Sequence, residues 1–422
     1  MPLPKHRVFS IIYVNMKYIS PILLVLCVAV GLAAATFAAC APSGADSIQR
    51  EDLFSLNIGP MEDQIALYSL EGDRGMRHVE LAMRDGFFYI VDNNGGKVVR
   101  YNSYGDLLFM IYNDETNPAP ISLKTRDGDG VQVTRWAFTY PLRSPGKIVV
   151  DSRKHIYVEE RLPYERHGFD DEDKALLDSV ILHFDSDGRF IEYLGQGGQG
   201  GGPFPRIVGL YDSIRDEIAV VCRLPSGWNT YWYSDRGEQL FLIQLKSNAI
   251  PAPPDWQNFS ASIDAIIAAP DARKLYIKVD YYRDVFDEST NTRVSAEPVS
   301  SLIWILNVEK GIYENSVEVP FYEYSFSERG KTTYMRLLYS MLGLLRDGGI
   351  LLYFPNETGY AVLRMNSDGH GQRRGFINID SEELSFNNFH LSPDGILSAL
   401  LVDDWKINIV WWRMNKFIRE LP

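Results

Sequence analysis

The chain has 422 residues, of which 45% are hydrophobic and 13% aromatic, and its formal net charge at pH 7 is −13. The hydrophobic content is sufficient for a folded core, and the length suits two or three domains or one large all-β domain. Nucleic acid and anionic membrane surfaces both repel a protein this acidic, so the charge argues against a nucleic-acid partner.

The first 39 residues have the three regions of a secretory signal. Scattered basic residues come first, an apolar run follows, and small side chains end the segment just before Cys40. The sequence Phe37-Ala38-Ala39-Cys40 resembles a bacterial lipobox, in which the cysteine receives a lipid. Lipoboxes usually have leucine where Phe37 stands, a departure that spirochaete lipoproteins tolerate.

This resemblance implies a signal peptide over residues 1–39, lipidation of Cys40 and a flexible tether over residues 40–52. The protein is then expected outside the cytoplasm, held by lipid on a bacterial membrane, at its periplasmic face or at the outer membrane. The alternative is an uncleaved transmembrane anchor, because about 20 apolar residues can span a bilayer. With Cys27 removed and Cys40 acylated, Cys222 remains alone, so we expect no internal disulfide and a buried thiol.

Residues 81–111 read as four short strands joined by tight turns. Runs of five or six apolar and aromatic residues alternate with Gly, Asn and Asp, which is the chemistry of strands and turns rather than of helices. Looser copies recur towards the C-terminus, so one four-stranded unit is repeated. Such a repeat predicts a β-propeller, an all-β ring of four-stranded antiparallel blades.

The number of blades follows from two sets of tight turns. Turns between the first and second strands are expected at residues 85–86, 152–154, 215–216, 271–273, 347–349 and 393–395. Turns between the third and fourth strands are expected at residues 104–106, 186–188, 235–237, 308–311, 367–369 and 414–416. Six of each alternate, which predicts six blades over residues 53–422. Residues 53–70 precede the first blade and are expected to supply an outer strand to the last one, closing the ring.

Several segments resemble NHL-type six-bladed propellers. The second strand of that family is matched by Tyr89-Ile90-Val91-Asp92 and Ile156-Tyr157-Val158-Glu159, and its fourth element by His183-Phe184-Asp185-Ser186-Asp187-Gly188. The Gly-rich link between blades is matched by residues 194–205. The first two blades match well, and the other four match only in turn positions. Lipidated propellers of this kind are familiar among spirochaetes, so the resemblance implies a bacterial cell-envelope lipoprotein.

The long connections are expected on one face of the ring. In a four-stranded meander, the two families of tight turns lie at one end of the blades and the remaining connections lie at the other. The long segments, residues 113–145, 159–178, 280–300 and 321–336, all belong to the second kind. Long loops on a rigid scaffold are where binding usually occurs, so this face is the expected docking surface for an envelope protein.

Aromatic and basic residues in these connections are the candidate binding residues. Tyr, Trp and Arg anchor protein partners and also stack on sugar rings. The alternative is that some of them pack the loops onto the ring, because aromatic side chains are often buried. The candidates are Arg161, Tyr164, His167, Arg223, Trp228, Tyr281, Tyr282 and Trp405.

Catalytic and metal-binding signatures are absent from the sequence. The Gly-rich run lacks the Lys-Ser/Thr of a phosphate loop, and the seven histidines show no paired metal spacing. We therefore expect a protein-binding or scaffold module with no enzymatic activity, no cofactor and no metal. One alternative is a metal-dependent propeller hydrolase or lactonase, to which Asp92 and Glu159 would contribute at the channel. Another is a glycan or peptidoglycan binder that uses Trp228, Tyr281 and Trp405.

Overall fold

The computed structural model describes residues 46–67, 78–125, 135–195, 201–253, 259–287, 289–328, 331–383, 386–414 and 417. The expected signal peptide, Cys40 and the first residues of the expected tether lie outside these ranges. None of the helices in the described part of the chain is long and apolar enough to cross a membrane.

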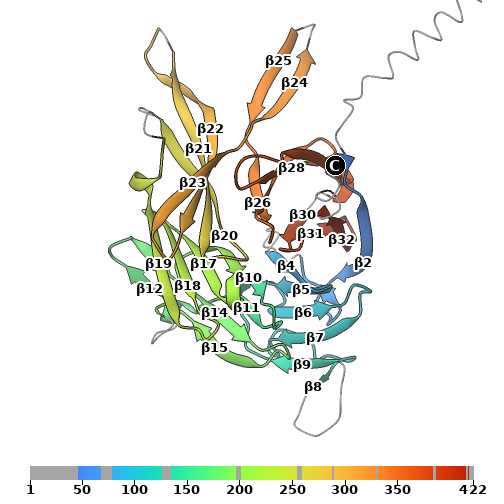
Figure 1. Ribbon diagram of the computed structural model, residues 1–422. Helices are drawn as coiled ribbons and strands as arrows, with labels where there is room; N and C mark the ends of the chain where they lie inside the picture. Colours follow the sequence, from blue (N-terminus) through green and yellow to red (C-terminus); the bar gives the residue numbers. More distant parts are fainter. Residues whose placement is uncertain are drawn as a thin grey trace, which may run out of the picture. The chain divides into compact units, whose positions relative to one another are not determined.

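The described strands form six blades around a common centre, which confirms the predicted all-β, six-bladed propeller (Figure 1). Blade one has β4 (Val79–Arg84), β5 (Phe87–Asp92), β6 (Lys97–Tyr101) and β7 (Leu107–Tyr112). Blade two has β10 (Pro145–Val150), β11 (Ile156–Arg161), β14 (Ser179–Phe184) and β15 (Phe190–Leu194). Blade three has β16 (Ile207–Asp212), β17 (Ile218–Leu224), β18 (Gly227–Tyr233) and β19 (Gln239–Lys246).

The other three blades follow in chain order. Blade four has β20 (Ser260–Ala268), β21 (Lys274–Phe286), β22 (Arg293–Asn307) and β23 (Ile312–Glu318). Blade five has β26 (Ser340–Leu344), β27 (Gly349–Asn356), β28 (Gly359–Asn366) and β29 (Arg373–Asn378). Blade six has β30 (Phe386–Leu391), β31 (Ile396–Val402), β32 (Lys406–Arg413) and, from the other end of the chain, β2 (Arg50–Ile58).

The sequence of blade one shows why these strands form. The side chains of β5 from Phe88 onwards and all those of β6 are buried, because each blade is covered on both faces by its neighbours. Asp85 and Gly86 both have positive φ, 51° and 77°, which matches the twist of a two-residue hairpin. Apolar strands and turn residues thus specify the blade together.

The ring is closed by β2, as the sequence predicted. It pairs antiparallel with β32, from Arg50 opposite Trp412 to Asn57 opposite Lys406. Short β3 (Gln64–Ile65) lies parallel to β2. Residues 415 and 416 of the predicted turn lie outside the described ranges, and β2 occupies the fourth place in blade six.

Strand structure begins within the range expected to be a tether. Short β1 (Asp46–Ser47) pairs in parallel with β29 of blade five, and β2 begins at Arg50. The expected start of the propeller at residue 53 is thus later than the first strand.

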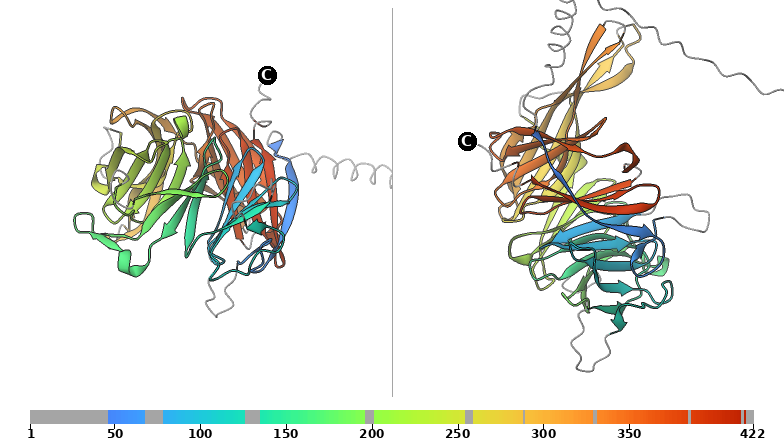
Figure 2. Two further views of the ribbon diagram at one scale, coloured as in Figure 1. Left: turned by 90° about the horizontal axis from the view of Figure 1, so that it is seen from below. Right: turned by 90° about the vertical axis from the view of Figure 1, so that its right-hand side faces the viewer.

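The long connections leave the blades at one end, as predicted. Because neighbouring strands in every blade are antiparallel, all connections from a second to a third strand, or from one blade to the next, lie at the same end. We call this end the hairpin face. It carries the hairpin of β12 (Gly168–Asp170) and β13 (Ala175–Leu177), the extended tips of β21 and β22, and the hairpin of β24 (Tyr322–Glu328) and β25 (Lys331–Leu337). The last two hairpins extend in the same direction (Figure 1 and Figure 2).

The connection after blade one differs from a simple loop. It contains β8 (Lys124–Thr125) and β9 (Trp136–Thr139), and β9 pairs in parallel with β7 at the outer edge of the blade. Trp136 donates its indole N–H to the carbonyl oxygen of Asp187 at 2.7 Å, which ties this edge to blade two. Part of the predicted loop therefore widens the blade.

Candidate functional site

The innermost strands of the six blades, β4, β10, β16, β20, β26 and β30, surround a central channel of about 240 Å³. At the end away from the hairpin face, the Arg84 guanidinium lies 2.7 Å from the Asp212 carboxylate. Arg84 ends β4 and Asp212 ends β16, so this ion pair crosses from blade one to blade three. The pair links the two strands on the side of the tight turns.

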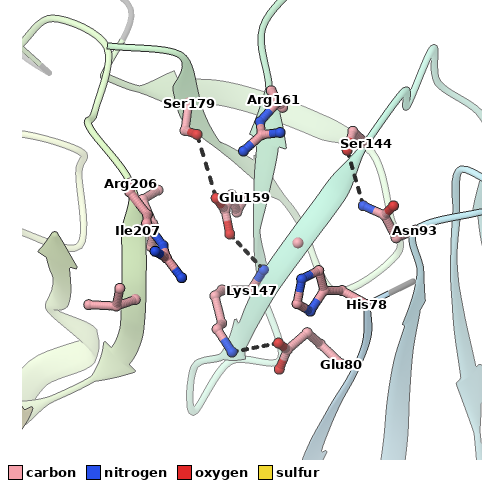
Figure 3. A pocket seen from close by; sticks show the side chains of 12 residues that line it. His78, Glu80, Asn93, Ser144, Lys147, Glu159, Arg161, Ser179, Arg206 and Ile207 are labelled. Atoms are coloured by element: carbon pink, nitrogen blue, oxygen red, sulfur yellow. Dashed lines mark hydrogen bonds and ion pairs between the residues drawn. The ribbon is translucent and has the colours of Figure 1, made fainter. Parts of the chain in front are cut away.

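At the hairpin-face end, the channel meets a larger cavity of about 570 Å³ between blades one, two and three (Figure 3). Its walls come from the beginnings of the innermost strands and from the end of β11. Six ionisable residues line it: His78, Glu80, Lys147, Glu159, Arg161 and Arg206. We call this the channel-mouth cavity.

The two carboxylates of the channel-mouth cavity have protein partners. Lys147 Nζ lies 2.5 Å from Glu80 Oε1, and Asn388 donates to Glu80 Oε2 at 3.3 Å. Glu159 Oε2 accepts the backbone N–H of Lys147 at 3.0 Å, and its Oε1 accepts the Ser179 hydroxyl at 3.5 Å. Burial raises the pKa of Glu159, because removal from water disfavours the charged carboxylate.

Glycine at position 146 allows the Glu159 carboxylate to reach the backbone. A Cβ at this position would collide with Oε2 of Glu159. The close approach fixes the carboxylate against the start of β10, where it receives the N–H of Lys147. Gly146 therefore shapes the cavity wall through its lack of a side chain.

The two arginine side chains of the cavity are more exposed to solvent than its carboxylates and have fewer partners. Arg161 contacts Asp178 through Nε at 3.3 Å, and its side chain is 62% exposed. Arg206 and His78 are exposed, and neither side chain has a partner among the described residues. Figure 3 shows Arg161 and Arg206 pointing towards the same space from two different blades. The cavity thus offers uncommitted positive groups.

Of the predicted candidates, Arg161 lines this cavity directly, and two others follow it closely in the chain. Tyr164 and His167 lie in or next to a 3₁₀ turn, η1 (Tyr164–Arg166), where their rings meet edge to face with centroids 5.5 Å apart. His167 Nε2 lies 2.8 Å from the carbonyl oxygen of Leu162, so it donates there, while Tyr164 is 83% exposed.

The other candidates are spread over blades three, four and six. The Arg223 guanidinium lies 4.5 Å from the ring centre of half-buried Trp228. Tyr282 is half-buried at the base of the extended β21, and Trp405 is 82% exposed between β31 and β32. The structure does not bring these residues together with Arg161.

The expectation of an exposed Tyr281 is wrong. Its ring is 1% exposed, its hydroxyl donates to the carbonyl oxygen of Pro251 at 2.5 Å, and it accepts the indole N–H of Trp304 at 2.8 Å. The reason is that β21 continues beyond Asp280, so the residue alternates inward as part of a strand. Tyr281 is a core residue in this structure.

The sequence reasoning missed Glu80, Lys147 and Arg206. Each stands within two positions of the start of an innermost strand, in three successive blades. A charged residue near the start of these strands would have been the signal, because that end of the strand faces the channel mouth. Asp92, which the hydrolase alternative placed at the channel, is fully buried, with its carboxylate 3.8 Å from Lys97 Nζ.

In the described part of the chain, no three His, Cys, Asp or Glu side chains are grouped closely enough to hold a metal ion. At the channel mouth, Lys147 occupies the position beside Glu80 that a cation would take. The donor set of the cavity therefore does not fit the divalent metal of the hydrolase alternative.

Exposed apolar side chains gather on the hairpin face. Those in its connections and hairpins are Ile121, Tyr164, Phe169, Leu176, Phe286, Val294, Tyr324, Tyr334, Met335 and Trp405. Of the other large apolar side chains that are exposed in the described ranges, Phe190, Ile191, Leu240, Leu242 and Ile312 lie on outermost strands. Tyr104 is the one in a tight turn at the opposite end.

No protein-family model matches the chain, and no curated protein matches its sequence. The chain is similar to several solved structures. The polysaccharide lyase Uly1 is 8% identical with a TM-score of 0.41, and the match covers 88% of this chain and 100% of that one. A gluconolactonase from Xanthomonas campestris is 14% identical with a TM-score of 0.39, covering 86% and 99%. The Dos1 propeller is 10% identical with a TM-score of 0.39, covering 83% and 82%. Likenesses at this level concern the fold and do not bear on activity.

Proposed function

We propose that the protein is a binding module, held by a lipid on Cys40 at a bacterial cell envelope, that docks a protein partner on its hairpin face. The observation that supports this proposal is the concentration of exposed apolar side chains on that face. Tyr, Trp, Phe and Met are enriched in the centres of protein interfaces, and water exposure of these groups is otherwise unfavourable.

Two of the hairpins are fixed to the blades by side-chain contacts. The ring of Tyr322, at the start of β24, stacks on Phe354 with centroids 4.7 Å apart. The Ser226 hydroxyl donates to Asp173 in the turn between β12 and β13 at 2.9 Å. Such anchoring lowers the entropy lost when a partner binds, so the hairpins are suited to act as a preorganised surface.

The glycan alternative has less support. It relied on three aromatic rings, but Tyr281 is buried and one face of Trp228 is covered by Arg223. Of the three, Trp405 alone offers an open ring. A stacking platform for several sugar units is therefore not formed by these residues.

Site-specific photo-crosslinking in the native envelope tests the docking proposal. A photoreactive amino acid would replace Tyr334 on β25, Trp405, or Tyr104 as a matched control that is 86% exposed at the opposite end. We expect a discrete protein adduct from the first two positions and none from Tyr104. Equal adducts from all three positions, or an adduct from Tyr104 alone, would contradict the proposal.

The anchor is tested separately by fractionation. Cys40→Ser should remove the lipid and release the protein from the membrane fraction, while the wild type stays with it. A Cys40→Ser protein that is still lipid-modified would contradict the assignment of the anchor without affecting the docking surface.

A further inference from the structure

The channel-mouth cavity brings two guanidinium groups together within an acidic protein. Arg161 and Arg206 line it from neighbouring blades, whereas the whole chain has a formal net charge of −13. Of the carboxylates in and beside the cavity, Glu80 pairs with Lys147 and Asp178 with Arg161, and burial raises the pKa of Glu159. Guanidinium groups in a concave site attract anions, because low-dielectric walls focus the field.

The two guanidinium groups keep hydrogen-bond donors that no other described residue of the protein accepts. Glu80 is neutralised by Lys147, and Glu159 is held by a backbone N–H and a hydroxyl. Arg206 has no partner among the residues described, and Arg161 is tied through one edge of its guanidinium only. An unpaired guanidinium presents a rigid fork of N–H donors that matches a planar carboxylate.

We propose that the channel-mouth cavity binds a small polar carboxylic acid, whose carboxylate is received by Arg206 and Arg161. This proposal does not depend on the proposed function, because a small acid can bind the cavity without a protein partner. A volume of about 570 Å³ suits a small molecule.

The rest of the cavity wall selects a polar ligand. Asn93, Ser144 and Ser179 line the cavity with amide and hydroxyl groups. Asn93 donates to Ser144 at 3.1 Å and Ser179 to Glu159 at 3.5 Å, so their oxygens are the groups that accept hydrogen bonds from a ligand. A singly charged carboxylate matches the one lining guanidinium that has no partner among the described residues, Arg206, whereas a doubly charged phosphate brings one more negative charge close to Glu80 and Glu159. The cavity therefore favours a carboxylate over a phosphate.

Access to the site is from the hairpin face. Its lining residues stand at the ends of the strands that carry the long connections, whereas the Arg84–Asp212 ion pair lies at the other end of the channel. A ligand at the channel mouth thus enters and leaves on the side of the long connections.

Isothermal titration calorimetry on the full-length protein tests the proposal. The probes are D-glucuronate and N-acetyl-L-alanine, their neutral counterparts D-glucose and N-acetyl-L-alaninamide, and inorganic phosphate. We expect saturable binding of at least one carboxylate, at least tenfold weaker binding of its neutral counterpart, and weaker binding of phosphate. Preference for glucuronate would identify a sugar acid, and preference for N-acetyl-L-alanine would identify a peptide-like acid.

Arg206→Gln and Arg161→Gln should each weaken carboxylate binding roughly tenfold, the effect of losing one hydrogen bond to a charged group. The matched control is Arg346→Gln, because Arg346 is 52% exposed and pairs with Asp394 at the opposite end. Thermal unfolding checks that all three variants remain folded. No saturable binding of either carboxylate at millimolar concentration, equal binding of the neutral probes, tighter binding of phosphate, or unchanged affinity in Arg206→Gln would each overturn the proposal.

Discussion

Lys97 offers the sharpest test of how the ring is held closed. Its side chain is fully buried, and its Nζ donates to the carbonyl oxygen of Met61 at 2.6 Å and lies 3.5 Å from that of Pro60. Both carbonyls belong to the segment that follows the closing strand β2. Nζ also lies 3.8 Å from the carboxylate of Asp92, which is fully buried as well. Lys97→Met keeps the length of the side chain but removes its charge and its donors.

The expected cost follows from two losses. The first loss is the hydrogen bonds of the Lys97 ammonium, since hydrogen bonds from a charged group contribute about 1.5–3 kcal/mol. The second is electrostatic, because Lys97→Met leaves the buried Asp92 carboxylate without its cation. Breaking a buried pair on one side typically costs about 3–5 kcal/mol, so we expect Lys97→Met to lose that much unfolding free energy. Urea denaturation of the wild type, Lys97→Met, Asp92→Asn and the double variant measures both the cost and the coupling.

The double variant should recover part of the loss, with a coupling energy of about 1–3 kcal/mol, because Asn removes the stranded charge. Lys274→Met is the matched control. Its Nζ lies 2.8 Å from Glu314 on the surface, and an exposed pair is worth about 0–1 kcal/mol.

The stability deficit of Lys97→Met should become smaller as the pH falls. Burial raises the pKa of Asp92, and the Coulombic attraction of Lys97 opposes this rise. Without Lys97 the pKa rises further, so the folded state takes up a proton more readily than the unfolded chain. The deficit of Lys97→Met should therefore shrink as the pH falls from 7 towards the ordinary carboxyl range. A loss below about 1 kcal/mol, or a deficit that grows on acidification, would refute the reasoning.

Three further predictions concern Tyr281, Trp405 and His183. Tyr281→Phe removes the acceptor of the Trp304 indole N–H, so it should cost about 1–3 kcal/mol of unfolding free energy by urea denaturation. Trp405→Ala should change that free energy by less than about 0.5 kcal/mol, because the side chain is 82% exposed, yet weaken the partner adduct in cross-linking of the envelope. Burial lowers the pKa of His183 from 6.5 to about 3, so the folded state favours the neutral ring and stability declines as the pH falls between these values. His183→Gln should flatten that decline by up to about 1.4 kcal/mol per pH unit, measured from urea midpoints across this range. Wild-type stability of Tyr281→Phe, an undiminished adduct with Trp405→Ala, or a wild-type pH slope in His183→Gln would contradict the respective prediction.

The blades could be predicted from the sequence because their signals are local. An apolar strand such as Phe87–Asp92 and a turn such as Asp85-Gly86 lie next to each other in the chain, and both are repeated. The closing role of β2 was also predictable, since a strand left over before the first blade is needed at the open edge of the last.

The channel-mouth cavity could not be predicted in the same way. Glu80, Lys147 and Arg206 lie far apart in the sequence and meet only because the ring places three blade ends together. The misplacement of Tyr281 has a different cause. Loop and strand look alike at Asp280, where polar residues follow an apolar run, but backbone pairing continues through Phe286 and sets the inward direction of alternate side chains.

The pairing of β2 with β32 has a consequence for how the protein is synthesised and folded. Arg50 leaves the ribosome long before its partner Trp412, so the sixth blade stays incomplete until β32 has been synthesised. A chain that is exported, as proposed here, therefore keeps its propeller ring open while it passes through a secretion channel. A truncated product lacking β32 would expose the edge of β2 to proteases and to other strands, so only chains that retain their final sheet escape this route to degradation.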